Sequence, residues 1–153
     1  MKKRGLVIIS LLAIGAVFVL CSCGGGGGKR LTKEQFADKA NALCASFSKS
    51  EKAAGNPSSV AEAITYFEKL TPLYEKRVAA LDKLKPPADE EATVNKIVSF
   101  EKNETALAKQ LLAALKKNDT TKANKLVASG NSNSGKAKAL YKQLGITGCA
   151  KSS

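Results

Sequence analysis

Residues 59–87, SVAEAITYFEKLTPLYEKRVAALDKLKPP, carry the pattern that decides the fold. Apolar residues recur there at the spacing of one helix face: Val60, Ile64, Phe67, Leu70, Tyr74, Val78, Leu81 and Leu84. Ser59 with Glu62 has the spacing of a capping box, and the proline pair at 86–87 ends the helix. Pro72 lies inside the pattern, so we expect a kink near residues 69–71; a break into two helices is the alternative.

The next segment predicts a third helix that ends near Lys117. Acidic residues at 89–91 suit the positive end of its dipole, and its apolar face is formed by Val94, Ile97, Val98, Leu107 or Ala108, Leu111, Leu112 and Leu115. The middle of this helix, residues 101–104, is polar all round. We expect Glu101 and Glu104 to form an exposed, solvated face, with Phe100 and Thr105 carrying the packing unless the bundle is weakest there.

A fourth helix follows a turn capped near Asp119. Helical spacing continues through Ala123, Leu126, Val127, Gly130, Ser134, Ala137, Tyr141 and Leu144. Residues 129–135 are poor in helix-forming side chains, so a loop is the alternative there, although the unbroken spacing favours one helix. Gly145 is the expected C-terminal cap, with Ile146 folding back.

The first helix lies on the amino-terminal side of the opening stretch. Thr32 and Gln35 form a second capping-box pattern. The apolar positions after them are Phe36, Ala40, Leu43, Cys44 and Phe47, and Gly55 ends the helix. No segment alternates with period two, so the sequence predicts an all-α fold. Four helices with short connections indicate an up-down-up-down four-helix bundle over residues 32–153.

The amino-terminal 22 residues have the layout of an export signal. A basic start, Met1 to Arg4, precedes an apolar run over residues 6–20. Leu20-Cys21-Ser22-Cys23 then fits a lipobox, with Cys23 as the residue that receives the acyl chains, such as palmitate. Cys21 is the weaker candidate because bulky Leu20 precedes it. An uncleaved membrane anchor is the other alternative, but a bilayer span needs about 20 apolar residues.

These features divide the chain into a cleaved signal peptide (residues 1–22), a lipidated cysteine with a glycine-rich flexible tether (23–31) and the helical bundle. The expected location is the extracytoplasmic face of the cell membrane, reached through the lipid. Cys44 and Cys149 are then the two remaining thiols, and in an oxidising compartment we expect them to form a disulfide. Two buried free thiols or a reactive pair are the alternatives. The tail after Leu144 reaches Cys44 only if it is nearly extended.

Charge gives weak information about partners. The whole chain has 25 Lys and Arg against 13 Asp and Glu. The lysines of the fourth helix, Lys122, Lys125, Lys136, Lys138 and Lys142, form a candidate site for anionic lipid or an acidic wall polymer. A solvated helix face is the simpler explanation. Nucleic acid is not expected outside the membrane, and no protein partner can be named.

Three short motifs resemble a known group. Ala40-Asn41-Ala42-Leu43-Cys44, Leu81-x-x-Leu84-x-Pro86-Pro87 and Leu144-Gly145-x-x-x-Cys149-Ala150 look like those of small exported lipoproteins of actinobacteria. The resemblance covers most of the chain after the signal. It implies a helical bundle with a cysteine pair and carries no implied activity.

The residue types of this chain argue against catalysis. The chain has no histidine, which excludes triads and metal sites built on imidazole. Glu101-x-x-Glu104 lacks the histidine of di-iron bundles, and the three tyrosines, Tyr66, Tyr74 and Tyr141, suit core boundaries better than a ligand cage. We expect no metal and no cofactor.

The expectation from sequence is therefore a non-enzymatic, membrane-anchored lipoprotein that serves binding or envelope structure. The alternative is a carrier or sensor that holds an apolar or anionic ligand between helices, near Pro72 and the polar middle of the third helix. A closed core without a void would argue against that alternative.

Overall fold

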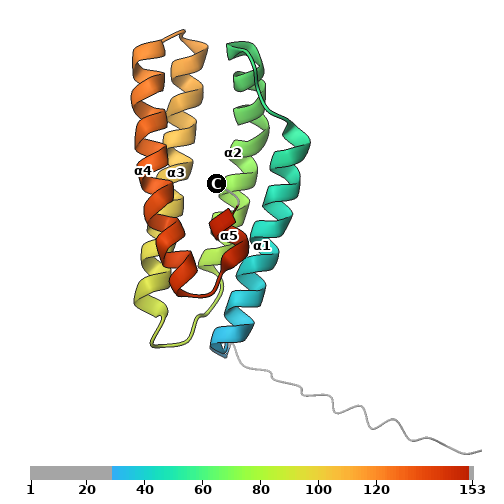
Figure 1. Cartoon of the computed structure of the whole chain (residues 1–153), viewed down its shortest axis with the longest axis vertical. Coiled ribbons are helices and arrows are strands. Elements are labelled where there is room, and N and C mark those ends of the chain that lie inside the picture. Colours follow the sequence, from blue (N-terminus) through green and yellow to red (C-terminus); the bar gives the residue numbers. More distant parts are fainter. Residues whose placement is uncertain (1–28, 152–153) are drawn as a thin grey trace, which may run out of the picture.

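The computed structural model describes residues 29–151 as four long helices and one short helix. They are α1 Lys33–Ala54, α2 Val60–Asp82, α3 Glu91–Lys116, α4 Thr120–Gln143 and α5 Thr147–Lys151. The long helices run alternately up and down (Figure 1), and the described part contains no strand. The predicted all-α four-helix bundle is confirmed.

The start of α1 follows the predicted capping box. The Thr32 hydroxyl accepts a hydrogen bond from the Gln35 backbone N–H at 3.2 Å, and the Gln35 side chain accepts one from the Thr32 N–H at 3.1 Å. At the other end Gly55 adopts a φ of 82°, a conformation that glycine reaches without strain. Both ends of this helix are thus set by local sequence.

The start of α2 departs from the prediction in one detail. Ser59 caps the helix through the Glu62 N–H at 3.2 Å. The Glu62 carboxylate, however, accepts hydrogen bonds from the N–H and hydroxyl of Ser58, at 2.7 and 2.8 Å. These hydrogen bonds lower the pKa of Glu62. Farther along, α2 passes through Pro72 as one helix, so the alternative of a break there is wrong.

Helices α3 and α4 are joined by a tight turn. Asn118 has a φ of 55°, and Asp119 caps α4 by accepting a hydrogen bond from the Lys122 N–H at 3.0 Å. Helix α4 continues through residues 129–135, which confirms the single helix and excludes the loop. Asn133 is buried in that stretch. The helical spacing had placed the small residues Gly130 and Ser134 on the packed face at this level.

The apolar core is divided into two clusters along the bundle. The larger one lies around Phe36, Cys44, Ile97, Tyr141 and Ile146, and the smaller one comprises Leu111, Ala114, Ala123 and Leu126. Buried polar residues, Glu101, Thr105 and Asn133, also occur in the helices that supply these clusters. Val60 and Val127, which the spacing placed on buried faces, are exposed. Val60 is the first residue of α2, and Val127 lies at the border of the apolar stripe of α4.

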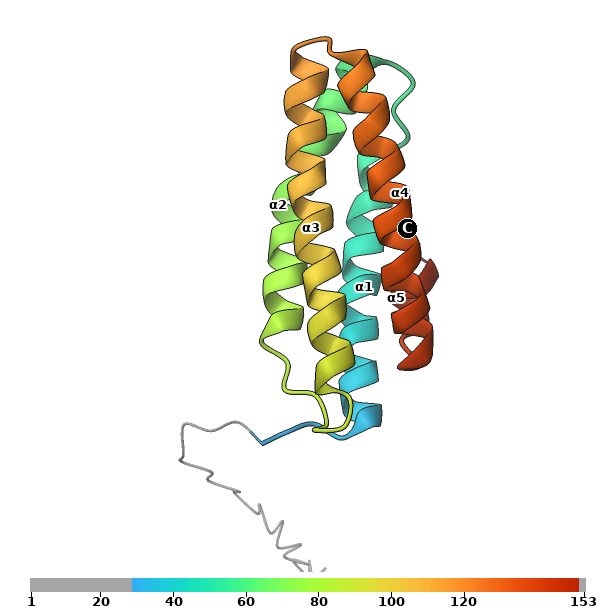
Figure 2. The same cartoon turned by 90° about the vertical axis from the view of Figure 1, so that its left-hand side faces the viewer.

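The carboxyl-terminal segment folds differently from the expected extended tail. Gly145 has a φ of 73°, and the Ile146 N–H donates to the Tyr141 carbonyl at 2.9 Å, as predicted for this cap. Ile146 is fully buried, and the chain then forms α5, which packs on α1 and α4. The start of α1 extends past the turn between α4 and α5 at this end of the bundle (Figures 1 and 2). Cys44, which lies farther along α1, is therefore close to that turn, and a short helix is long enough to reach it.

A disulfide joins α5 to α1. Cys44 and Cys149 are bonded with their Cα atoms 5.0 Å apart, as predicted, and both are buried. Next to it the Gly148 N–H donates to the Asn41 side chain at 2.8 Å. A Cβ atom at Gly148 would lie 2.9 Å from that Asn41 oxygen, so a larger residue would push α5 away from α1.

The chain joins the bundle before α1 begins. The Leu31 N–H donates to the Lys85 carbonyl at 2.8 Å, Arg30 pairs with Glu91 at 2.7 Å, and Lys33 pairs with Glu90 at 2.6 Å. The predicted signal peptide, Cys21, the lipidated Cys23 and the glycines at 24–28 lie outside the described residues. Over residues 29–151 we find no helix with the length and apolar character needed to cross a bilayer.

We predict that unreduced peptide maps will recover Cys44 and Cys149 in one linked species. Because the disulfide closes a loop between residues 105 apart, its reduction should lower the free energy of unfolding by about 2–5 kcal/mol, measured in denaturant titrations. Two free thiols in the native protein, or equal stability before and after reduction, would contradict this.

Candidate binding groove and the polar network beside it

A groove of about 210 Å³ lies between α2, α3 and α4. Helix α2 contributes Tyr66, Phe67 and Tyr74. Helices α3 and α4 contribute Glu104, Leu107, Ala108, Leu111, Leu126, Val127, Gly130 and Asn131. Most of these side chains are apolar or aromatic, and Glu104 is the only charged one among them. The groove therefore combines an apolar wall with one carboxylate.

The arrangement of the helices leaves room for the groove. Among the described residues α1 packs on α2 and α5, and α4 packs on α3 and α5, but α1 and α4 do not pack directly on each other. Helix α5, which carries Cys149, lies between α1 and α4 and packs on both (Figures 1 and 2). No residue of α1 or α5 lines the groove, although Phe47 of α1 packs on the groove residue Tyr74.

A buried ion pair lies next to the groove. Glu101 of α3 binds the guanidinium of Arg77 of α2 through one carboxylate oxygen, and its other oxygen accepts a hydrogen bond from the Tyr141 hydroxyl at 2.9 Å. The Glu101 and Arg77 side chains are 6% and 10% exposed. Burial, together with the charge of Glu101, raises the pKa of Tyr141. One carboxylate thus joins three helices.

Aromatic rings hold Arg77 in place. Its guanidinium carbon lies 4.4 Å from the centre of the Phe47 ring and 5.3 Å from that of Tyr74, and these two rings are 4.5 Å apart. Such stacking is favourable for a cation removed from water. Arg77 Nε is buried and has no hydrogen-bond partner in the described part of the chain.

Glu104 lies one turn beyond Glu101 and has a different environment. Its Oε2 accepts a hydrogen bond from the Asn133 side chain at 3.2 Å. The same amide group donates to the Phe100 carbonyl at 2.8 Å, and its oxygen accepts from Asn103 at 2.9 Å. Burial raises the pKa of Glu104, while Asn133 and the nearby cations oppose that rise. Burial also raises the pKa of Tyr74.

The predicted exposed face at residues 101–104 is therefore wrong for Glu101 and only partly right for Glu104. Arg77 and Asn133 were not identified as site residues either. Each of the three polar residues continues a seven-residue repeat of buried positions: Leu70 to Arg77, Val94 to Glu101, and Leu126 to Asn133. This spacing places the three polar residues on buried helix faces, and it is the feature of the sequence from which their burial could have been predicted.

The candidate anionic-surface lysines of α4 do not gather on one face. Lys122, Lys125, Lys136 and Lys142 are exposed and form no ion pair with a described residue. At 3.6 residues per turn, the first three lie on one flank of the helix, and Lys138 and Lys142 lie on the other. Lys138 is half-buried and lines a small cavity that also contacts Arg77, Glu101 and Glu104.

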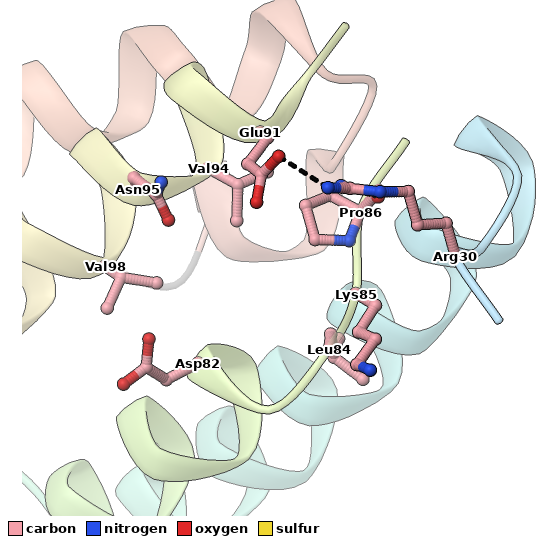
Figure 3. Close-up of a pocket in the computed structure, with 9 residues that line it drawn as sticks. All are labelled: Arg30, Asp82, Leu84, Lys85, Pro86, Glu91, Val94, Asn95 and Val98. Carbon is pink, nitrogen blue, oxygen red and sulfur yellow. Dashed lines mark hydrogen bonds and ion pairs between the residues drawn. The ribbon is translucent and has the colours of Figure 1, made fainter. Parts of the chain in front are cut away.

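A larger hollow, of about 340 Å³, lies where the chain enters the bundle. Figure 3 shows Arg30 paired with Glu91 beside it, with Val94 and Val98 farther along the same helix. Arg30 also donates to the Pro86 carbonyl at 3.1 Å, and Asp82 pairs with Lys102 at 2.8 Å. Because these charges are already paired, the hollow offers a ligand less than the groove does.

Another hollow, of about 290 Å³, lies between the adjacent helices α1 and α2. It is lined by residues such as Leu43, Phe47 and Leu73 and contains no carboxylate. No group of three or more potential metal ligands is present within residues 29–151. The acidic residues at 89–91 contribute Glu90 and Glu91 to ion pairs with Lys33 and Arg30. The groove is therefore the best candidate site.

Comparison with known proteins adds no relative. No family model, no curated protein and no solved structure matches this chain.

We predict that Glu104 makes stability depend on pH. Since its pKa is raised in the folded state, the folded protein binds this proton more tightly than the unfolded chain. Stability from this group is therefore lost as pH rises through the folded pKa. Urea unfolding at pH 4.5 and pH 7 should show Glu104→Gln gaining stability relative to the wild type at the higher pH.

The exposed Glu34 provides the control, because Glu34→Gln removes a carboxylate without removing a buried charge. It should show no such gain between the two pH values. A pH-independent difference between Glu104→Gln and the wild type would contradict the assignment.

Proposed function

We propose that this protein is a lipid-anchored binding protein of the cell envelope and that its groove holds an apolar ligand. The observation that carries the proposal is the groove of about 210 Å³ between α2, α3 and α4. It lies beside the polar middle of α3, the region where we expected a carrier or sensor to hold its ligand. Binding is the role that a groove with an apolar wall and one carboxylate supports best.

The size and lining of the groove suit a small apolar body. An engineered apolar cavity of about 150 Å³ binds benzene, so this groove has room for an aromatic ring with a short substituent. Tyr66, Phe67 and Tyr74 contribute aromatic rings to one wall, and Leu111 and Leu126 provide aliphatic surface on the others. Removing such a body from water supplies most of the binding free energy.

The polar network supports a binding role better than catalysis. Both oxygens of Glu101 are engaged, one by Arg77 and one by Tyr141, which suits a structural carboxylate rather than a general base. Glu104 is the remaining carboxylate at the groove, and it faces an apolar surface. We therefore propose that the domain binds its ligand without chemical change.

The proposed location rests on the amino-terminal sequence and the disulfide. Leu20-Cys21-Ser22-Cys23 fits a lipobox, and the Cys44–Cys149 bond suits an oxidising compartment outside the cytoplasm. The resemblance of three motifs to small exported lipoproteins of actinobacteria supports the same location. The exposed lysines of α4 are available to anionic lipid or an acidic wall polymer as a further partner.

We predict that Gly130→Leu will block the groove. Gly130 lines it, and a Cβ atom built there meets nothing within 4 Å, so the leucine side chain has space to occupy. Toluene added to the full-length protein in lipid nanodiscs should shift the leucine methyl NMR signals of Leu107, Leu111 and Leu126, and Gly130→Leu should abolish those shifts.

Gly135→Leu is the matched control. Gly135 lies in the same helix, is exposed, does not line the groove, and also has open space around a Cβ atom. Both substitutions should improve helix propensity by about 1 kcal/mol, so loss of binding in Gly130→Leu alone identifies the groove. Equal toluene shifts in both variants would refute it.

We predict that a fatty-acid analogue supplied to producing cells will label the wild-type protein and not Cys23→Ala. Acyl chains bound to this cysteine hold the protein at the membrane, since each buried CH₂ contributes about 0.8 kcal/mol. Labelling is measured by in-gel fluorescence after coupling of a dye. Equal labelling of wild type and variant would remove the lipid anchor from the proposal.

A further inference from the structure

Glu104 and Tyr74 mark the end of the groove that adjoins the small cavity. Glu104 is the groove's only charged lining residue, and it also lines the small neighbouring cavity together with Tyr74, Arg77 and Lys138. Tyr74 lines both spaces as well. A molecule in the groove would therefore meet apolar and aromatic walls along its body and a carboxylate at this end.

The Glu104 carboxylate is only partly satisfied by the protein. Asn133 donates to Oε2 at 3.2 Å, and no hydrogen bond to Oε1 is found within the described residues. The cations nearby do not line the groove. Arg77 is committed to Glu101 and stacked on Phe47, and half-buried Lys138 lines only the small cavity. Arg77 and Lys138 act on the charge of Glu104 from the small cavity, but neither side chain lines the groove.

We infer that the ligand is a hydrophobic amine: an apolar body the size of an aromatic ring that carries a protonated amino group, paired with Glu104. This inference rests on the proposed function, because it concerns the same groove. The ligand class follows from charge complementarity, because the only charged residue that lines the groove is the acidic Glu104.

The surroundings of Glu104 favour such a ligand over neutral or acidic ones. An ammonium group donates to the carboxylate, and hydrogen bonds between charged groups are stronger than neutral ones. Tyr66, Phe67 and Tyr74 also line the groove, and aromatic rings attract cations. A carboxylic acid in its ionised form would place a second negative charge beside Glu104.

Three probes with similar apolar bodies test the inference: 2-phenylethylamine, 2-phenylethanol and 3-phenylpropanoate. Their affinities for the full-length protein in nanodiscs are measured at pH 7 by leucine methyl NMR titration. We expect the amine to bind about tenfold more tightly than the alcohol, since a charged hydrogen bond is worth more than a neutral one. The carboxylate should bind more weakly than the alcohol.

Glu104→Gln preserves the shape of the side chain and removes its charge. In that variant the affinity for the amine should fall about tenfold more than the affinity for the alcohol, so that the amine loses its advantage over the alcohol. Unchanged amine affinity in Glu104→Gln, or equal affinity of the wild type for amine and alcohol, would overturn the inference.

The outcomes separate this inference from the proposed function. If the alcohol binds and Gly130→Leu abolishes its binding, but the amine has no advantage, the groove remains a binding site and only the ligand class is wrong. If no probe shifts the groove signals, the groove itself is wrong. Retained wild-type NMR spectra outside the groove show that each variant is folded.

Discussion

The buried ion pair between Arg77 and Glu101 is the interaction on which the rest of the structure depends. Removing two charges from water is costly unless each finds a partner, and here Glu101 is bound by Arg77 and Tyr141. Arg77 in addition lies against the packed rings of Phe47 and Tyr74. Because the three partners lie on α2, α3 and α4, satisfying this one carboxylate fixes the relative position of three helices.

The two ends of the bundle differ around this network. On one side the larger apolar cluster is closed by α5 and by the Cys44–Cys149 disulfide. On the other side the smaller cluster, around Leu111 and Leu126, adjoins the groove that neither α1 nor α5 lines. The structure thus combines a half that is closed covalently with a half that carries the groove, and Glu104 lies where they meet.

Local sequence signals predicted the helices well because their causes are local. Thr32 with Gln35, Asp119 and Gly145 each act within one turn of the chain, and helical spacing identified all four long helices. The disulfide followed from the count of cysteines and the expected compartment. The capping box predicts that the Glu62 side chain accepts a hydrogen bond from the Ser59 N–H. It instead accepts two from Ser58, one residue earlier, which offers both its N–H and its hydroxyl.

The site was harder to predict because its causes are distant in sequence. A charged residue in a helix is usually exposed, and only the seven-residue repeat marked Glu101 as buried. Its partners are 24 and 40 residues away, so the sequence alone did not show that its charge is compensated. The groove depends on α2 and α4 both packing on α3 without packing on each other, and α5 depends on where α4 ends relative to α1.

The most direct measurement of this account is a double-mutant cycle on the buried pair. The free energy of unfolding is compared for the wild type, Arg77→Met, Glu101→Gln and the double variant. Each single change should cost about 3–5 kcal/mol, because it leaves the other charge buried without its partner, and the double variant should lose clearly less than the sum. Single losses that are small and simply add in the double variant would contradict the central role of this ion pair.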